Sequence, residues 1–111
     1  MVGQTSSTAL AGAILRERTI ADLRAIEPEL RRRGVAALRL FGSSARGEAT
    51  RDRDVDLLLT PASGHTFSLL DMSGVRLFVS DRLGRRAEVL IDADASPDFL
   101  ARIADDLLTV Y

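Results

Sequence analysis

Two aspartates, Asp54 and Asp56, stand on either side of one valine at the start of an apolar run, Val55 to Thr60. Alternate residues of a β-strand point to the same face, so this spacing predicts that both carboxylates share a face while Val55 points into the core. Neighbouring carboxylates repel each other unless a cation lies between them. Magnesium prefers oxygen ligands completed by phosphate oxygens and water, so the pair is a candidate magnesium site.

A third acidic residue, Glu88, lies inside the apolar run Ala87 to Ile91. A carboxylate is costly to bury unless it is paired or binds a metal. We therefore expect Glu88 to join the acidic face of Asp54 and Asp56, and Asp92 is a weaker substitute for this third position. The alternative is that Glu88 is an edge-strand carboxylate that faces water.

The run Gly42-Ser43-Ser44 follows a predicted strand over Val35 to Phe41. A glycine at a strand end lets the backbone approach a phosphate closely. The serine hydroxyl and the free amides of a helical turn that begins at Ser44 would donate hydrogen bonds to that phosphate. Glycine-serine followed at this spacing by Asp-x-Asp is far more specific than either pattern alone, and it predicts a phosphate-binding turn beside a magnesium site.

The remaining pattern predicts the elements that must position these residues. Thr19 to Asp22 resembles a capping box that opens a helix, and Ser96 with Pro97 predicts the start of a last helix that runs to about residue 108. Residues 1–18 are expected to be flexible or partly helical, and residues 19–111 to form one domain. The other predicted helices span residues 29–33 and 67–83, and the predicted strands span residues 35–41, 55–60 and 87–91.

Composition excludes several classes of protein. The chain has 111 residues, which fits one domain, and it has no cysteine, which excludes disulfides and thiolate metal sites. All basic residues are arginine, which excludes Schiff-base and P-loop lysine chemistry. A net charge of −1 and 5% aromatic residues argue against nucleic-acid binding. The N-terminus lacks the basic region of a signal peptide, and the apolar stretch Ala9 to Leu15 is too short to span a membrane. We expect a cytoplasmic protein that does not associate with membranes.

The segment from Leu40 to Leu59, LFGSSARGEATRDRDVDLLL, resembles the signature of the minimal nucleotidyltransferase (MNT) family in the DNA polymerase β-like superfamily. In that signature, glycine-serine and alanine-arginine-glycine precede Asp-x-Asp in a hydrophobic strand. The resemblance spans about residues 20–111. It implies an α+β fold of the polymerase β-like nucleotidyltransferase type, with a small mixed sheet of three to four strands packed with helices.

The resemblance also implies roles for single residues. Gly42 and Ser43 would bind a nucleoside triphosphate, and Ser44 and Arg46 lie in the same segment as further candidates for nucleotide binding. For Arg46, an ion pair with the protein is as good an interpretation as a phosphate contact. Two Mg²⁺ ions would be held by the metal-ligand candidates, which are also the catalytic candidates: Asp54, Asp56 and Glu88. The family usually has aspartate where Glu88 stands.

These roles imply an enzyme that transfers AMP from ATP to a hydroxyl. MNT proteins are paired with a helical HEPN partner, so the resemblance implies an antitoxin that adenylylates a tyrosine of its toxin. The acceptor would be the HEPN-type toxin or another protein, and a homo-oligomer or hetero-oligomer is possible. One alternative is a catalytically weak or inactive module of the same fold that neutralises or scaffolds a partner by binding. Another is a small-molecule adenylyltransferase that completes its site by dimerising.

Overall fold

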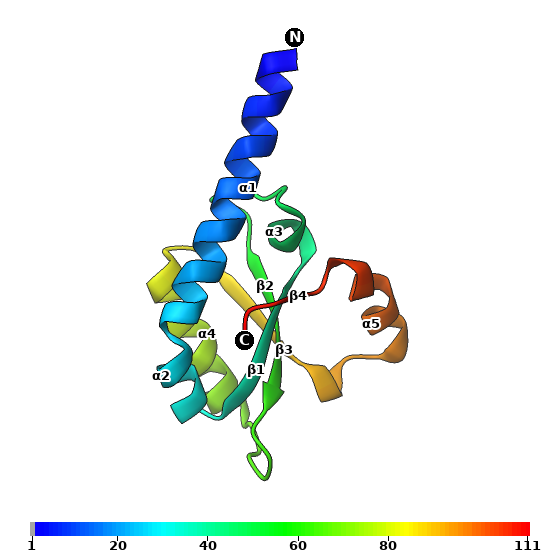
Figure 1. Cartoon of the computed structure of the whole chain (residues 1–111). Coiled ribbons are helices and arrows are strands. Elements are labelled where there is room, and N and C mark those ends of the chain that lie inside the picture. The colour runs from blue at the N-terminus through cyan, green and yellow to red at the C-terminus, as the bar shows by residue number, and fades with distance from the viewer. Residues whose placement is uncertain (1) are drawn as a thin grey trace.

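The computed structural model describes the backbone of residues 2–111 and the side chains of residues 7–111. Helices and strands alternate along the chain, and α1 projects beyond the rest of the fold (Figure 1). The helices are α1 (Val2–Ala25), α2 (Glu27–Arg32), α3 (Gly42–Arg46), α4 (Leu69–Leu83) and α5 (Pro97–Ile103). The strands are β1 (Val35–Phe41), β2 (Val55–Pro61), β3 (Ala87–Ile91) and β4 (Leu108–Thr109), and the 3-10 turns are η1 (Asp92–Asp94) and η2 (Ala104–Asp106).

The four strands form one mixed sheet in the order β3-β2-β1-β4. Strand β1 pairs antiparallel with both β2 and β4, whereas β2 and β3 are parallel. The parallel pair is connected through α4, because parallel neighbours need a crossover rather than a tight turn. This arrangement confirms the predicted α+β fold with a small mixed sheet.

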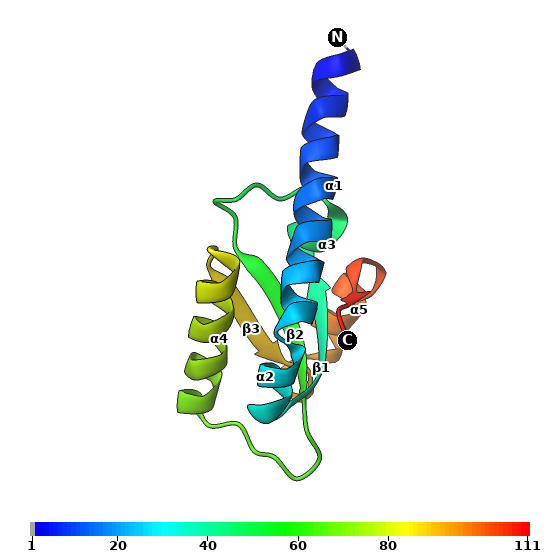
Figure 2. The ribbon, with the colours of Figure 1, turned by 60° about the vertical axis from the view of Figure 1, so that its left-hand side comes forward.

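The main core lies on one face of the sheet. Alternate residues of β2, namely Val55, Leu57 and Leu59, are fully buried there. Figure 2 shows that α1, α2 and α4 lie in front of this face, while α5 lies on the far side of β1. Because side chains alternate along a strand, Asp56 and Leu58 of β2 point to the opposite face. The helices α1, α2 and α4 therefore cover the face of Val55, Leu57 and Leu59, and Asp56 lies on the other face of the sheet.

The N-terminal prediction is wrong at one point, because α1 runs through residue 19 without a break. The Thr19 hydroxyl does not cap a helix; it donates a hydrogen bond of 2.7 Å to the carbonyl of Leu15, one turn earlier. A threonine inside a helix can satisfy its hydroxyl in this way. The expected helix start at Thr19 is therefore wrong, because the helix begins well before this residue.

The C-terminal helix starts as predicted and ends early. The Ser96 side chain accepts a hydrogen bond from the amide of Phe99, and Pro97 occupies the first turn of α5. The helix stops at Ile103 rather than near residue 108, and β4 follows and pairs with β1. Helix α4 starts at Leu69, two residues later than expected, behind a capping box formed by Ser68 and Asp71. None of the helices in the described residues is long and apolar enough to cross a membrane.

Candidate active site

The glycine-serine turn lies directly beside the second aspartate of the Asp-x-Asp pair. In the β1–β2 ladder, Phe41 is the partner of Asp56. The next residue, Gly42, has a positive φ of 73°, which is left-handed backbone that favours glycine. A Cβ atom at Gly42 would stand 2.6 Å from Oδ2 of Asp56, closer than atoms can pack. Both the conformation and the space at this position therefore require glycine.

Two of the three predicted carboxylates are neighbours across the parallel strands. Asp56 of β2 is the register partner of Glu88 of β3, so the two side chains share the face opposite Val55. Asp54 lies just before β2 and joins them through Arg86. Nε of Arg86 lies 3.1 Å from Oε1 of Glu88 and 3.9 Å from Oδ2 of Asp54.

The acidic face carries unfavourable negative charge. Partial burial raises the pKa of the Asp56 carboxyl above its ordinary value, and the nearby carboxylates of Asp54 and Glu88 raise it further. Arg46 and Arg53 lower the same pKa, but their effect is smaller. A cation bound at this face would relieve that repulsion. The face therefore has the charge and the oxygen donors of a cation site.

The structure does not bring all three carboxylates into one preformed metal-binding group. Within residues 7–111, no set of three or more histidine, aspartate or glutamate side chains is placed to hold a metal ion. Asp54 and Glu88 instead share the guanidinium of Arg86. The substitute residue Asp92 is also engaged elsewhere, since it accepts a hydrogen bond of 2.5 Å from Thr60.

The Ser44 side chain faces the interior of the protein. Ser44 is buried, with 3% of its surface exposed, and its hydroxyl accepts a hydrogen bond of 3.2 Å from Nη2 of Arg85. Its side chain therefore supports the turn from inside the protein. Ser43 is only partly buried, and its carbonyl accepts a 2.9 Å hydrogen bond from the amide of Glu48. Of these two serines, Ser43 is the more exposed, so its hydroxyl is the one available to a ligand.

Arg46 is engaged with the protein. Its Nε donates to Glu48 over 2.8 Å, and its Nη1 donates to Asp106 of η2 over 3.0 Å. These bonds tie α3 to the turn that precedes β4. The ion-paired interpretation of Arg46 is the one observed here.

The chain matches the family model described as "Nucleotidyltransferase domain" over residues 23–107. The chain belongs to this nucleotidyltransferase family. It is 32% identical over 87 residues to "Putative protein adenylyltransferase MJ0435" of Methanocaldococcus jannaschii, a match that covers 78% of the chain and 91% of the relative.

Two solved structures share the fold. One is the structure of a protein assigned as a minimal nucleotidyltransferase, with 32% identity and a TM-score of 0.65 over 87% of this chain and 93% of the other. The second contains the tri-AMPylated HEPN toxin of Shewanella oneidensis in complex with an MNT antitoxin. It has 14% identity and a TM-score of 0.56 over 90% of this chain and 71% of that one.

Two arginines of this nucleotidyltransferase were missed at the sequence level. Arg86 and Glu88 are two residues apart, and alternation in a strand places such residues on one side. That spacing is a signal that could have identified Arg86 as the partner of Glu88. Arg85 gave no comparable signal, because its burial depends on segments from three other parts of the chain.

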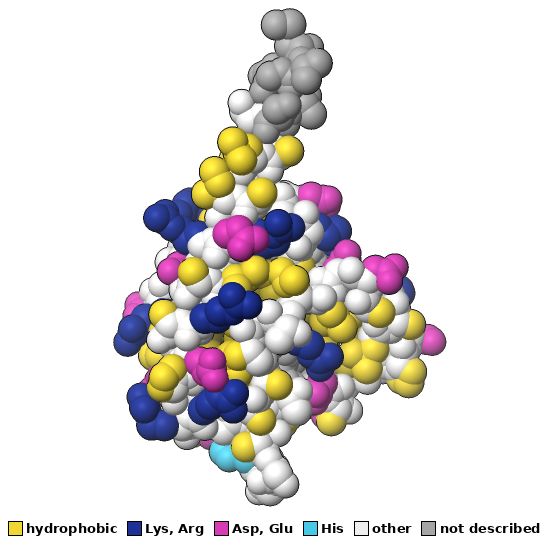
Figure 3. Space-filling view, in the orientation of Figure 1, with side chains coloured by type: hydrophobic (Ala, Val, Ile, Leu, Met, Phe, Trp, Pro, Cys, Tyr) yellow, Lys and Arg dark blue, Asp and Glu magenta, His cyan; other side chains and the backbone are white. Residues whose placement is uncertain are grey.

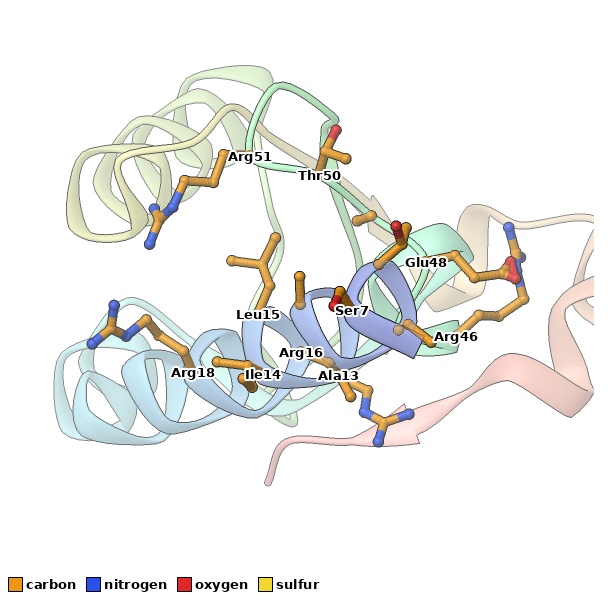
Figure 4. Close-up of a pocket in the computed structure, with 16 residues that line it drawn as sticks. Ser7, Ala13, Ile14, Leu15, Arg16, Arg18, Arg46, Glu48, Thr50 and Arg51 are labelled. Atoms are coloured by element: carbon orange, nitrogen blue, oxygen red, sulfur yellow. The ribbon is translucent and has the colours of Figure 1, made fainter. Parts of the chain in front are cut away.

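A broad, open hollow of about 1030 Å³ lies elsewhere in the nucleotidyltransferase. It runs between α1, from Ser7 to Arg18, and the loop from Arg46 to Arg51. Figure 4 shows Leu15 between α1 and this loop, with Arg18 and Arg51 extending on the same side. The hydrophobic residues Leu10 and Ile14 are exposed on the projecting part of α1, where Figure 3 shows apolar side chains together. The hollow is not lined by Asp54, Asp56 or Glu88, so we do not place the nucleotide there.

Proposed function

We propose that this nucleotidyltransferase transfers AMP from ATP to a tyrosine hydroxyl of a HEPN-type toxin and thereby acts as its antitoxin. The observation that carries the proposal is the acidic face of Asp56 and Glu88 beside the Gly42 turn, in a chain 32% identical to an adenylyltransferase relative. The likeness to an MNT antitoxin bound to an AMPylated toxin supports the choice of partner.

The donor set fits magnesium, and this fit is part of the proposal. Asp54, Asp56 and Glu88 would supply the oxygen ligands, once Glu88 leaves the guanidinium of Arg86. Bound Mg²⁺, in two ions, would neutralise the leaving pyrophosphate and make the acceptor hydroxyl a better nucleophile.

The residues of the chain would position the donor. The Gly42 turn lies directly against Asp56, so a triphosphate bound at this turn would lie beside the acidic face, and the Ser43 hydroxyl would donate to a phosphate oxygen. The tyrosine oxygen bonds to the α-phosphorus while the bond from that phosphorus to the bridging oxygen breaks. Pyrophosphate leaves with the electron pair, and the hydroxyl proton passes to a carboxylate of the acidic face. Positioning and charge neutralisation contribute most of the rate in such transfers.

The test uses the purified chain, Mg²⁺, ATP labelled in its α-phosphate, and the product of the neighbouring reading frame. We expect label on the partner with the wild-type chain and with Asp81→Asn, an exposed aspartate of α4 on the other side of the sheet. Asp54→Ala should abolish the label. Equal labelling by wild type and Asp54→Ala, or no labelling by the wild type, would contradict the proposal.

A second candidate function is supported by the pairing of Arg86 with both Asp54 and Glu88. If these ion pairs persist with nucleotide present, the chain would bind a partner without catalysis. Titration calorimetry with ATP separates the two functions, because an active site gives heat that depends on Mg²⁺ and a non-catalytic module gives none.

A further inference from the structure

The nucleotidyltransferase contains a buried arginine that the transfer scheme above does not use. Arg85, just before β3, has only 6% of its surface exposed. Its guanidinium donates four hydrogen bonds, all to uncharged oxygens. Nη1 donates to the Thr19 hydroxyl over 3.1 Å, and Nη2 donates to the Ser44 hydroxyl over 3.2 Å, the Thr50 carbonyl over 3.3 Å and the Arg53 carbonyl over 3.1 Å.

Three of these four contacts are made with residues 44–53, the segment between the Gly42-Ser43 turn and Asp54. Ser44 belongs to the turn after Gly42, and Arg53 immediately precedes Asp54. The amide of Arg53 also donates to the carbonyl of Thr50, so the two carbonyls that meet Arg85 come from one turn. The fourth contact anchors the guanidinium to α1 through Thr19. Arg85 therefore joins the glycine-serine turn, the loop before Asp54 and the first helix.

The chemistry of Arg85 is unusual for a buried arginine. Such residues are normally paired with a carboxylate. The four hydrogen bonds of Arg85 all go to uncharged oxygens, and burial and the nearby charge of Arg51 lower its pKa. Its Nε is buried and has no hydrogen-bond partner among the described residues. A planar guanidinium can reach several acceptors at fixed angles, which the single ammonium of lysine cannot do. Burial of this charged side chain without a carboxylate partner costs free energy, which indicates that the geometry of its hydrogen bonds is important.

We propose that Arg85 is a positioning residue of the transfer reaction, which fixes the loop of residues 47–53 so that Asp54 stays in register with the Gly42 turn. The proposal rests on the proposed function. Figure 4 shows part of this loop, with Thr50 and Arg51, beside α1. A displacement of about 1 Å in a reacting arrangement can cost about 100-fold in rate. Loss of Arg85 should therefore lower kcat more than it raises KM for ATP.

The experiment compares Arg85→Met, Arg85→Lys and the matched control Thr19→Val. Thr19→Val removes the anchor on α1, together with the hydrogen bond from Thr19 to Leu15 within that helix, and leaves the contacts to the turn and the loop. For each variant we would measure thermal unfolding, amide hydrogen exchange over residues 47–54, and the kinetics of AMP transfer in the presence of Mg²⁺. These readouts separate a loss of stability from a loss of loop order.

We expect Arg85→Met to exchange faster in residues 47–54 than global unfolding explains and to lose about 10-fold to 100-fold in kcat. Arg85→Lys should recover part of both. Thr19→Val should unfold at a lower temperature with exchange in the loop and kcat within about twofold of wild type. If Arg85→Met does not fold, Arg85→Lys and Ser44→Ala allow the same comparison with Thr19→Val.

Two results would overturn the inference. One is a folded Arg85 variant with wild-type exchange in residues 47–54. The other is a loss of kcat that follows the loss of stability equally in Arg85→Met and Thr19→Val. A wild-type chain that transfers no AMP would instead contradict the proposed function, and the exchange data would still decide the role of Arg85.

Discussion

At Asp56, the negative charge that would bind a metal ion also lowers the stability of the fold. It is wedged between the Gly42 turn and Glu88, and burial and two carboxylates raise its pKa. A raised pKa means that the folded chain holds the proton more tightly than the unfolded chain. The ionised form therefore destabilises the fold. This cost is absent below the ordinary carboxyl pKa and is fully present above the raised one.

Asp56→Asn should stabilise the chain at neutral pH. The amide keeps the shape of the side chain and removes the charge, so we expect unfolding about 2–4 °C higher at pH 7, a modest effect because the group is partly solvated. The gain should vanish as the pH falls through the raised pKa, where wild-type Asp56 is also neutral. Calorimetry across pH measures this, with Asp81→Asn as the control. A gain that grows on acidification would contradict the assignment.

Arg86 contacts Asp54 and Glu88, so it should compete with a metal for both. Arg86→Gln removes the positive charge, and we expect the affinity for Mg²⁺ alone to increase about 3-fold to 5-fold, since the pair is exposed and screened. Titration calorimetry without nucleotide measures this change. Arg82→Gln is the control, because Arg82 lies on α4 over the ring of Phe78. Weaker binding by Arg86→Gln would show that the arginine assembles the site.

Among the elements, α1 packs closely against the start of the loop of residues 47–53, where two glycines are in contact. A Cβ atom at Gly12 would stand 1.9 Å from the carbonyl oxygen of Gly47, which caps α3 with a φ of 72°. No side chain longer than hydrogen fits between them. The first half of α1 is thus packed on the loop that leads to Asp54.

This contact predicts opposite effects for two substitutions that look alike in sequence. Alanine normally stabilises a helix interior over glycine by about 0.5–1 kcal/mol. Gly74→Ala in α4 should show this gain, since its Cβ would meet only the flexible end of Arg33 at 3.4 Å. Gly12→Ala should lose about 1–3 kcal/mol because the clash is with backbone. Thermal unfolding measures both, and a stabilised Gly12→Ala would refute the packing of α1.

Sequence patterns predicted the elements whose signals are local. The strands β1 and β3 and the cap at Ser96 came out as expected, because alternation and capping are properties of short segments. Strand β4 was missed, since two residues carry no pattern and their pairing with Leu40 is settled by contact far along the chain. The break before Thr19 was wrong because a capping box and an internal threonine look the same in sequence.

In the candidate site, too, the local features could be predicted from the sequence and the contacts between distant segments could not. Alternation predicted that Asp54 and Asp56 share one side of the strand, but Asp54 lies just before β2. Asp56 is the register partner of Glu88 because β2 and β3 pair. The inward orientation of Ser44 could not be predicted, because it depends on Arg85, which arrives from the other end of the crossover. Side-chain networks that join distant segments leave no mark on periodicity.

At the scale of the whole molecule, the sheet separates the main hydrophobic core from the acidic face. The helices α1, α2 and α4 cover one face of the sheet (Figure 2). Asp56 and Glu88 are register partners whose side chains point to the other face. Substitutions in the helical core, such as Leu23 or Val79, should therefore act through stability. Substitutions of Asp54 or Glu88 should lower AMP transfer, and Asp56→Asn should also raise stability. Arg85 fits neither group, because it joins α1 to the loop before Asp54.

The antiparallel pairing of β1 with β2 also has a consequence for how the chain finds its native state. Contacts between segments near each other in the chain form faster, because closing a short loop costs less entropy. Phe41 and Asp56 are separated only by the loop between β1 and β2, so they can pair once this loop closes. Leu40 and Leu108 are far apart in the chain, so they pair only after most of the residues between them have folded. We expect the β1–β2 hairpin to bring Asp56 to Gly42 early in refolding. The last strand would dock onto it late.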